Sequence, residues 1–143
     1  MRLNDSTDIA LRIMIHAAST GGQRITIDQI VAHYHLPRST VMKVVNALTQ
    51  GGFLSAQRGR SGGLTLARDA GDIPVSALVE HMETDFALAE CMRPGNACTI
   101  TRRCRLISPL EEARRAFLAA LARYSVADIA LAPAEFRLTA TDT

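Results

Sequence analysis

The 143-residue sequence predicts a mainly helical protein with one small β-hairpin. Apolar residues make up 48% of the chain, but aromatic residues only 4%, so small aliphatic side chains supply the apolar content that suits packed helices. Apolar positions recur at helical spacing in several segments, and one glycine-rich turn separates two short alternating runs. A chain of this length predicts one domain, or one compact domain with an appended helix.

The first predicted helix starts at Asp5–Thr7 and ends at Gly21–Gly22. Asp8 and Arg12 are four residues apart and share a face typical of a solvated ion pair. The opposite face carries apolar residues at helical spacing: Ile9, Ile13, Met14 and Ala17.

A second and a third helix follow at short distance. Thr26 and Gln29 have the spacing of a capping box, and the helix they open must end before Pro37, because the residue before proline avoids the helical region. The next helix restarts at 38–40 with Ser39 as its expected cap, and Gly51 ends it. Two helices joined by a tight turn predict a helix-turn-helix.

The segments 53–58 and 64–68 alternate in polarity around the glycine-rich turn at 59–63. A hairpin directly after a helix-turn-helix is a wing, and this one carries Arg58 and Arg60 near its tip. Residues 1–72 are therefore expected to form a winged helix-turn-helix domain for double-stranded DNA. They hold eight Lys/Arg and five Asp/Glu, a bias too mild to establish DNA binding by itself. The expected DNA contacts are Arg38, Ser39, Thr40, Lys43, Arg58 and Arg60.

Residues 73–107 predict a short helix from Pro74 to about Glu83, capped by Asp72, and then a loop. Residues 108–132 predict a long helix capped by Ser108 and a short terminal helix capped by Ser125, and 133–143 a flexible tail. The apolar stripe of the long helix either packs on its own subunit or forms a two-fold seam. Dimerisation suits a helix-turn-helix, which usually presents two recognition helices one DNA turn apart. The stripe consists of Leu110, Ala113, Phe117, Ala120, Leu121 and Tyr124.

All the cysteines of the chain lie in the loop, with the spacing Cys91-x6-Cys98-x5-Cys104. Three thiols within so short a segment can converge on one soft metal centre. Structural zinc sites usually show tighter cysteine pairs, so an iron–sulfur cluster is favoured, with zinc, a metal-free thiol switch or a chance grouping as alternatives. Neighbouring arginines would favour the thiolate form and offset the negative charge of a cluster: Arg93, Arg102, Arg103 and Arg105.

A cluster with four ligand positions needs one donor besides the three cysteines. The sequence leaves several oxygen and nitrogen donors open, with solvent as a further alternative. The candidate side chains are Asp8, Glu90, His81, His33 and His35.

The chain resembles the bacterial winged-helix iron–sulfur regulators that include IscR, NsrR and RirA. The resemblance covers nearly the whole sequence and rests on four segments: Met1–Leu3 with Thr7-Asp8 and Leu11-Arg12, the wing 58–63, the cysteine loop ending in Cys104-Arg105-Leu106, and Tyr124–Asp128. It implies a homodimer held by the long helices, with a cluster in each cysteine loop close to the partner's DNA-binding part. By the same resemblance, Asp8 of the partner subunit is the expected fourth ligand, and Arg12 is expected near the cluster.

Within this family, Asp8 and the segment 98–104 are most similar to the nitric-oxide-sensing NsrR members, whereas the run 86–91 is similar to RirA-type iron sensors. No histidine follows Cys104, which disfavours the three-cysteine, one-histidine 2Fe–2S site of IscR. The resemblance thus implies a repressor that senses nitric oxide through a 4Fe–4S cluster, a 2Fe–2S cluster being the alternative cofactor. A regulator of the same fold that responds to iron or iron–sulfur status is the alternative function. The sequence contains no nucleophile–base pair or phosphate loop, so an enzyme is not expected. The absence of a signal peptide or long apolar run predicts a cytoplasmic protein.

Overall fold

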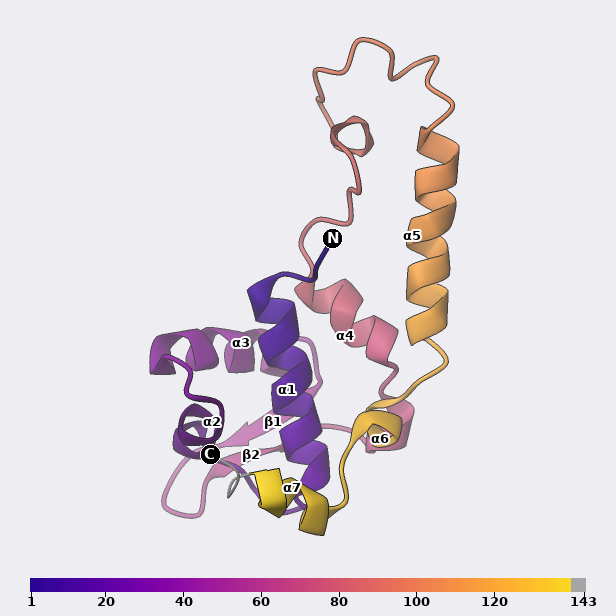
Figure 1. Cartoon of the computed structure of the whole chain (residues 1–143). Helices are drawn as coiled ribbons and strands as arrows, with labels where there is room; N and C mark the ends of the chain where they lie inside the picture. Colours follow the sequence, from indigo (N-terminus) through magenta and orange to yellow (C-terminus); the bar gives the residue numbers. More distant parts are fainter. Residues whose placement is uncertain (140–143) are drawn as a thin grey trace.

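The structure, a computed structural model, describes residues 1–139 and divides them between a compact body and a projecting arm (Figure 1). The body holds α1 to α4, the hairpin β1–β2 and the two last helices, while the arm consists of residues 83–106 and α5. The helices are α1 Asp5–Ser19, α2 Ile27–Tyr34, α3 Arg38–Gln50, α4 Val75–Met82, α5 Ile107–Leu121, α6 Val126–Ile129 and α7 Pro133–Thr139. The strands are β1 Leu54–Gln57 and β2 Gly63–Leu66, and two short 3₁₀ turns are η1 Ala70–Asp72 and η2 Glu90–Met92.

The core of the body is built around α1, which packs against α3 and α4. Ile13 and Met14 on α1 and Leu48 on α3 are fully buried, as the helical spacing of their apolar positions predicts. The hairpin is antiparallel and pairs Leu54 with Leu66, and Leu64 pairs on its other side with Ile25. The predicted fold class, mainly helical with a small hairpin wing, is confirmed.

The helix boundaries show where local signals decide and where they do not. Thr26 and Gln29 form the predicted capping box, with Thr26 Oγ1 accepting from the Gln29 N–H at 3.2 Å, and His35 ends α2 in the left-handed conformation. The predicted cap at Ser39 is wrong, because the first helical bond runs from the Val41 N–H to the Pro37 carbonyl and makes Pro37 the N-cap. Ser39 therefore lies inside the first turn of α3.

Two further predicted caps are also wrong. The Leu110 N–H donates to the Leu106 carbonyl, so α5 begins at Ile107 and Ser108 is already helical. Pro109 is tolerated in this first turn, since the N–H groups there have no partner within the helix. Asp72 belongs to a 3₁₀ turn, and Pro74 is the N-cap of α4.

The end of the described chain differs from its prediction. Ser125 caps α6 as predicted, and this short terminal helix ends at Ile129. Residues 133–139, for which the sequence predicts a flexible tail, form α7, and residues 140–143 of that tail lie outside the described residues. Phe136 on α7 stacks on His33 with ring centroids 4.8 Å apart and contacts His16 at 4.5 Å. The last described helix is thus placed by contacts with α1 and α2.

His16 gives this packing a pH dependence. Its side chain is 6% exposed, and burial, with a smaller contribution from the neighbouring His33, lowers its pKa from 6.5 to about 4. As the pH falls below 6.5, the unfolded chain takes up a proton that the folded chain does not, so stability is lost toward pH 4. In His16→Gln, we expect the free energy of unfolding to fall by up to about 3 kcal/mol less between pH 7 and pH 4 than in the parent chain. Denaturant titrations at several pH values measure this difference, and identical pH profiles would contradict it.

Candidate DNA-binding face and cysteine loop

The exposed face of α3 is the first candidate site. Val41, Val44, Val45 and Leu48 are buried against the body, which turns the opposite side of the helix to solvent. Ser39 and Lys43 are exposed on that side, and Ser39 is free of a capping role. Thr40, an expected DNA contact, is only half-exposed, so it is less accessible than Ser39 and Lys43.

Arg38 occupies the start of α3 but is engaged by α2. Its guanidinium forms an ion pair with Asp28, and both side chains are more than half exposed. An exposed pair of this kind contributes only about 0–1 kcal/mol. A phosphate oxygen can therefore replace the Asp28 carboxylate at little cost, which keeps Arg38 a candidate phosphate contact.

The wing projects its arginines from a turn that requires a glycine at position 62. A Cβ at Gly62 would lie 2.4 Å from the Gln57 carbonyl oxygen, so the chain closes here because no side chain is present. The Arg24 guanidinium donates to the Ser61 carbonyl and ties the turn to the body. Arg58 and Arg60 are exposed, and neither forms an ion pair within residues 1–139.

Replacing Arg60 with alanine tests whether the wing contacts phosphate. We expect weaker binding to specific and random DNA alike, with the slope of log affinity against log salt reduced by about one, because one phosphate contact is lost. Titrations of labelled duplexes at several salt concentrations measure both quantities. Arg123→Ala removes an exposed arginine after α5 and serves as the control. If the two substitutions had equal effects, Arg60 would not contact phosphate.

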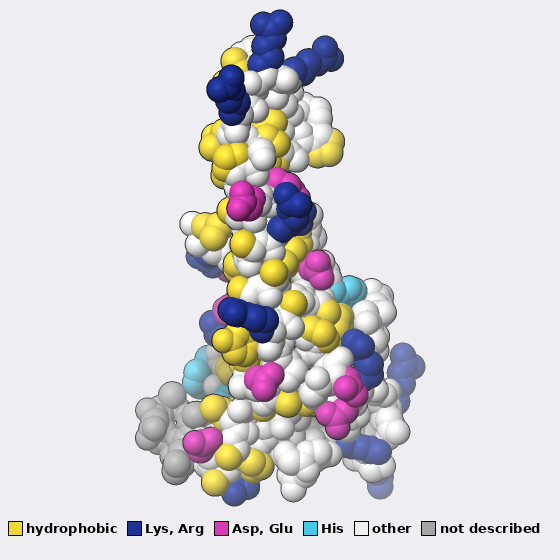
Figure 2. Space-filling view, turned by 90° about the vertical axis from the view of Figure 1, so that its right-hand side faces the viewer, with side chains coloured by type: hydrophobic (Ala, Val, Ile, Leu, Met, Phe, Trp, Pro, Cys, Tyr) yellow, Lys and Arg dark blue, Asp and Glu magenta, His cyan; other side chains and the backbone are white. Residues whose placement is uncertain are grey.

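The three cysteines lie in the part of the arm farthest from the wing (Figure 1). Cys91 sits in η2, Cys98 and Cys104 follow in the loop, and all three are free thiols that are half-buried. Within residues 1–139 the structure gathers no three His, Cys, Asp or Glu side chains into a group that could hold a metal ion. The donor set still suits a soft metal centre, since its thiols are accessible and close in sequence. Arginine side chains stand at the tip of the arm (Figure 2): Arg102, Arg103 and Arg105 are exposed.

A hydrogen-bonded frame inside the loop was not anticipated from the sequence. Asn96 bonds to the backbone of Cys91 and of Cys98, and Glu90 accepts from the Ala97 N–H at 3.1 Å. A sequence signal for this frame does exist. Asn96 follows Gly95, which has a φ of +69°, and asparagine in a turn commonly bonds to nearby backbone.

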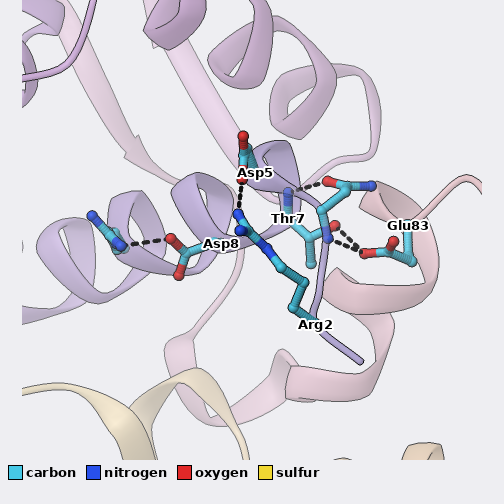
Figure 3. Close-up of polar contacts among 7 residues, drawn as sticks. Arg2, Asp5, Thr7, Asp8 and Glu83 are labelled. Atoms are coloured by element: carbon cyan, nitrogen blue, oxygen red, sulfur yellow. Dashed lines mark hydrogen bonds and ion pairs between the residues drawn. The ribbon is translucent and has the colours of Figure 1, made fainter.

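Asp8 and Arg12 form the predicted contact, with Arg12 Nη2 and Asp8 Oδ2 2.5 Å apart and both side chains about half exposed. Figure 3 shows this pair on α1 beside a second group of contacts at the start of the helix. There Glu83 Oε2 accepts from the Thr7 hydroxyl at 2.7 Å and from the Asn4 N–H at 3.1 Å. Glu83 directly follows α4 and begins the arm, so this carboxylate joins the arm to the helix that carries Asp8.

The other candidate fourth ligands lie at different places. His81 Nε2 lies 2.8 Å from the Ala47 carbonyl oxygen and joins α4 to α3, and His33 packs in the aromatic group under α7. His35 is exposed at the end of α2. Glu90 lies next to Cys91 but already accepts the Ala97 N–H. Asp8 remains the candidate whose carboxylate is exposed and held only by a surface ion pair.

The residues of the predicted stripe differ in their exposure on α5. None of its residues is buried, but Leu110, Phe117 and Leu121 are half-buried. Phe117 lines a cleft of about 390 Å³ with the N-terminal residues and 86–88. Ala113 and Ala120, which the sequence placed on the same stripe, are exposed, as are Ala116 and Ala119. Figure 2 looks onto this side and shows hydrophobic side chains along the column of the arm.

Comparisons with known proteins agree with this architecture. The chain is 37% identical over 131 residues to the HTH-type transcriptional regulator NsrR of Bacillus subtilis (strain 168), covering 90% of each chain. It is 34% identical to the regulator of the same name from Geobacillus kaustophilus (strain HTA426), covering 90% of this chain and 89% of that one. The oxidised form of Staphylococcus aureus CymR superposes with a TM-score of 0.72 at 19% identity, covering 91% and 96% of the two chains. The structure titled T. potens IscR gives 0.69 at 18% identity, covering 90% and 85%, and at such identities these structures show the fold alone.

A winged helix-turn-helix with a projecting helix, similar in sequence to named transcriptional regulators, defines a transcriptional regulator rather than an enzyme. The profile of one family, described as iron-dependent transcriptional regulator, matches residues 3–132. The chain belongs to this family, Rrf2. Both the expected family and the expectation that the chain is not an enzyme are confirmed. No helix within residues 1–139 has the length and apolar character needed to span a lipid bilayer.

Proposed function

We propose that the chain is a cytoplasmic, homodimeric repressor that binds its operator DNA while holding a 4Fe–4S cluster, and that releases the DNA in response to nitric oxide. One observation carries the proposal: the three cysteines of the chain lie in a single arm that is hydrogen-bonded, through Glu83, to the helix of the DNA-binding body that bears Asp8. The similarity to regulators named NsrR favours nitric oxide over other signals.

The divisions expected from the sequence serve different parts of this function. The domain 1–72 reads DNA through Ser39, Thr40 and Lys43 on α3, while Arg38, Arg58 and Arg60 contact phosphate. The segment 73–107 supplies the cysteines. The region 108–132 supplies the dimer contact, since α5 presents an unburied alanine face that another copy can approach closely.

The thiolates of Cys91, Cys98 and Cys104 would hold the cluster, and Asp8 of the partner subunit would supply the fourth ligand. Cysteine thiolates are the usual ligands of iron–sulfur clusters, and the exposed arginines of the loop would offset the negative charge. When bound, such a cluster supplies iron that reacts with nitric oxide. For the Asp8 carboxylate to serve, it must exchange its ion pair with Arg12, which would then lie beside the cluster.

A ligand shifts a conformational equilibrium only if it binds two states with different affinity. Here the two states are the cluster-bound and cluster-free forms, which differ in the order of the loop and in the partner of the Asp8 carboxylate. With both engaged, the contact of Glu83 with Thr7 and Asn4 transmits the position of the arm to α1, which packs on the recognition helix α3. Release of the loop would remove this connection between the arm and α1 and change the spacing of the two recognition helices.

An iron-responsive regulator of the same fold is the second candidate, and the description of the family as iron-dependent favours it. The two candidates differ in their signal, so one experiment separates them. Anaerobic protein with measured iron and sulfide is bound to operator DNA, and release is followed after adding nitric oxide or an iron chelator. Fast release by nitric oxide supports the proposal. Fast release by the chelator, with binding intact under nitric oxide, replaces it by the iron-responsive function.

The assignment of Asp8 has its own test in Asp8→Ala. Because Asp8 is exposed and paired only with Arg12, we expect the fold and the dimer to persist. The absorption and circular dichroism of the cluster, or its rate of reaction with nitric oxide, should change because one iron loses its protein oxygen ligand. Asp5→Ala is the matched control, since Asp5 is an exposed carboxylate on the same helix paired with Arg2. Spectra and rates equal to those of the parent would remove Asp8 from the ligand set.

A further inference from the structure

We infer that Asn96 is the positioning residue of the cysteine loop, holding the backbones of Cys91 and Cys98 in one fixed turn and so setting the positions from which their thiols would bind a metal. The inference deepens the proposed function and rests on it, since it assigns the residue that prepares this loop for a metal centre. It concerns the loop before any metal is bound.

The side chain of Asn96 uses both ends of its amide. Nδ2 donates to the Cys91 carbonyl at 3.3 Å and to the Arg93 carbonyl at 3.0 Å. Oδ1 accepts from the Cys98 N–H at 3.2 Å and lies 2.8 Å from the Thr101 hydroxyl, which also lies 3.0 Å from the Cys98 carbonyl oxygen. One side chain therefore joins the first metal-binding position to the second across six intervening residues.

These bonds matter because the loop has no core of its own. None of residues 84–106 is buried, so apolar packing does not hold the segment in one conformation. Two other side-chain contacts cross parts of this segment: Arg93 pairs with Asp85, and Glu90 accepts from the Ala97 N–H. Asn96 is half-buried, which limits the access of competing water to its amide. It is the side chain through which Cys91 and Cys98 are connected.

The chemistry of the residue type supports the assignment. An asparagine offers two donors and an acceptor with two lone pairs, and the four contacts use this capacity in full. An aspartate at this position would keep the acceptor for Cys98 and Thr101 but would lose both donors to Cys91 and Arg93. An alanine would lose both halves. Comparing asparagine, aspartate and alanine at this position therefore distinguishes the connection to Cys91 from the connection to Cys98.

Hydrogen exchange in the metal-free, reduced full-length protein gives a first test. The Cys98 N–H should exchange about 10-fold faster in Asn96→Ala than in the parent, because its acceptor is gone, and should remain protected in Asn96→Asp. Thr99→Ala, an exposed substitution in the same loop, is the control and should leave the rate unchanged. Equal Cys98 exchange in the parent and Asn96→Ala would overturn the inference, independently of any cluster.

Titration with Co²⁺, which thiolates bind with a charge-transfer absorption, gives the second test. Asn96→Ala should bind Co²⁺ about 10–100-fold more weakly than the parent, as is usual when a residue that orients metal ligands is removed, and Asn96→Asp should fall in between. Equal affinities and spectra in the parent and Asn96→Ala would overturn the inference. Failure of the proposed function would instead show as absence of iron and sulfide in the anaerobic parent protein, a separate measurement.

Discussion

Replacing Cys104 with alanine is expected to give a folded chain that holds neither iron nor sulfide and binds operator DNA about 10³-fold more weakly than the loaded parent. The loss is large because specific binding exceeds non-specific binding by at least about this factor, and two thiolates with one carboxylate leave a cluster incompletely held. The fold should persist, since Cys104 is only half-buried and its Sγ accepts a single contact, from the Leu106 N–H at 3.4 Å. Iron and sulfide analysis with operator titration under anaerobic conditions measures both effects.

Thr99→Ala is the matched control for this result. Thr99 lies in the same loop and is exposed, so its removal should change neither iron content nor operator affinity. If Cys104→Ala retained the iron and sulfide of the parent, Cys104 would not be a ligand. If it lost both but bound operator as tightly as the loaded parent, the cluster would not control DNA binding.

The fold could be predicted from the sequence where a local signal and the core agree. Two signals act over only three or four residues: the capping box of Thr26 with Gln29, and Pro37, which ends the preceding helix. The structure shows both effects. The caps predicted at Ser39 and Ser108 failed for a common reason. A backbone bond formed earlier in the chain, to Pro37 in one case and to Leu106 in the other, had already started the helix.

Helix α7 could not be predicted because its cause is tertiary. A seven-residue helix is too short to be stable by itself. The sequence from Pro133 onward is mainly polar and gives no helix signal. Phe136 is placed by His33 and His16, which lie about a hundred residues earlier in the chain. Contacts of this separation leave no periodicity in the segment itself.

The candidate site divides in the same way. The clustering of Cys91, Cys98 and Cys104 is visible in the sequence because it needs no knowledge of the fold. The roles of Glu83 and Asn96 are not, because they depend on which backbone atoms the folded chain brings near them. Glu83 shows this clearly: its partners Thr7 and Asn4 are nearly eighty residues away, and one of them, Thr7, is fully buried.

Placing arginine at both Ala116 and Ala120 is expected to convert the proposed dimer into a folded monomer that no longer binds operator with high affinity. The two alanines lie four residues apart on one exposed face of α5, where small side chains allow a second helix to approach closely. Two long charged side chains would separate the helices and introduce like charges across a two-fold axis. Sedimentation measures the mass, and operator titration should show a loss of about 10³-fold, since one recognition helix then replaces two.

The same two positions provide the control. In Ala116→Ser and Ala120→Ser together, the side chains remain small, so the dimer and operator binding should persist. The free energy of unfolding of the monomeric arginine variant should differ from that of the parent monomer by no more than about 0.5 kcal/mol. The reason is that both side chains are exposed in the single chain. The half-buried Leu110, Phe117 and Leu121 are not altered. If the arginine variant remained a dimer, the dimer interface would have to lie on another face, and the alanine face of α5 would be exposed to solvent.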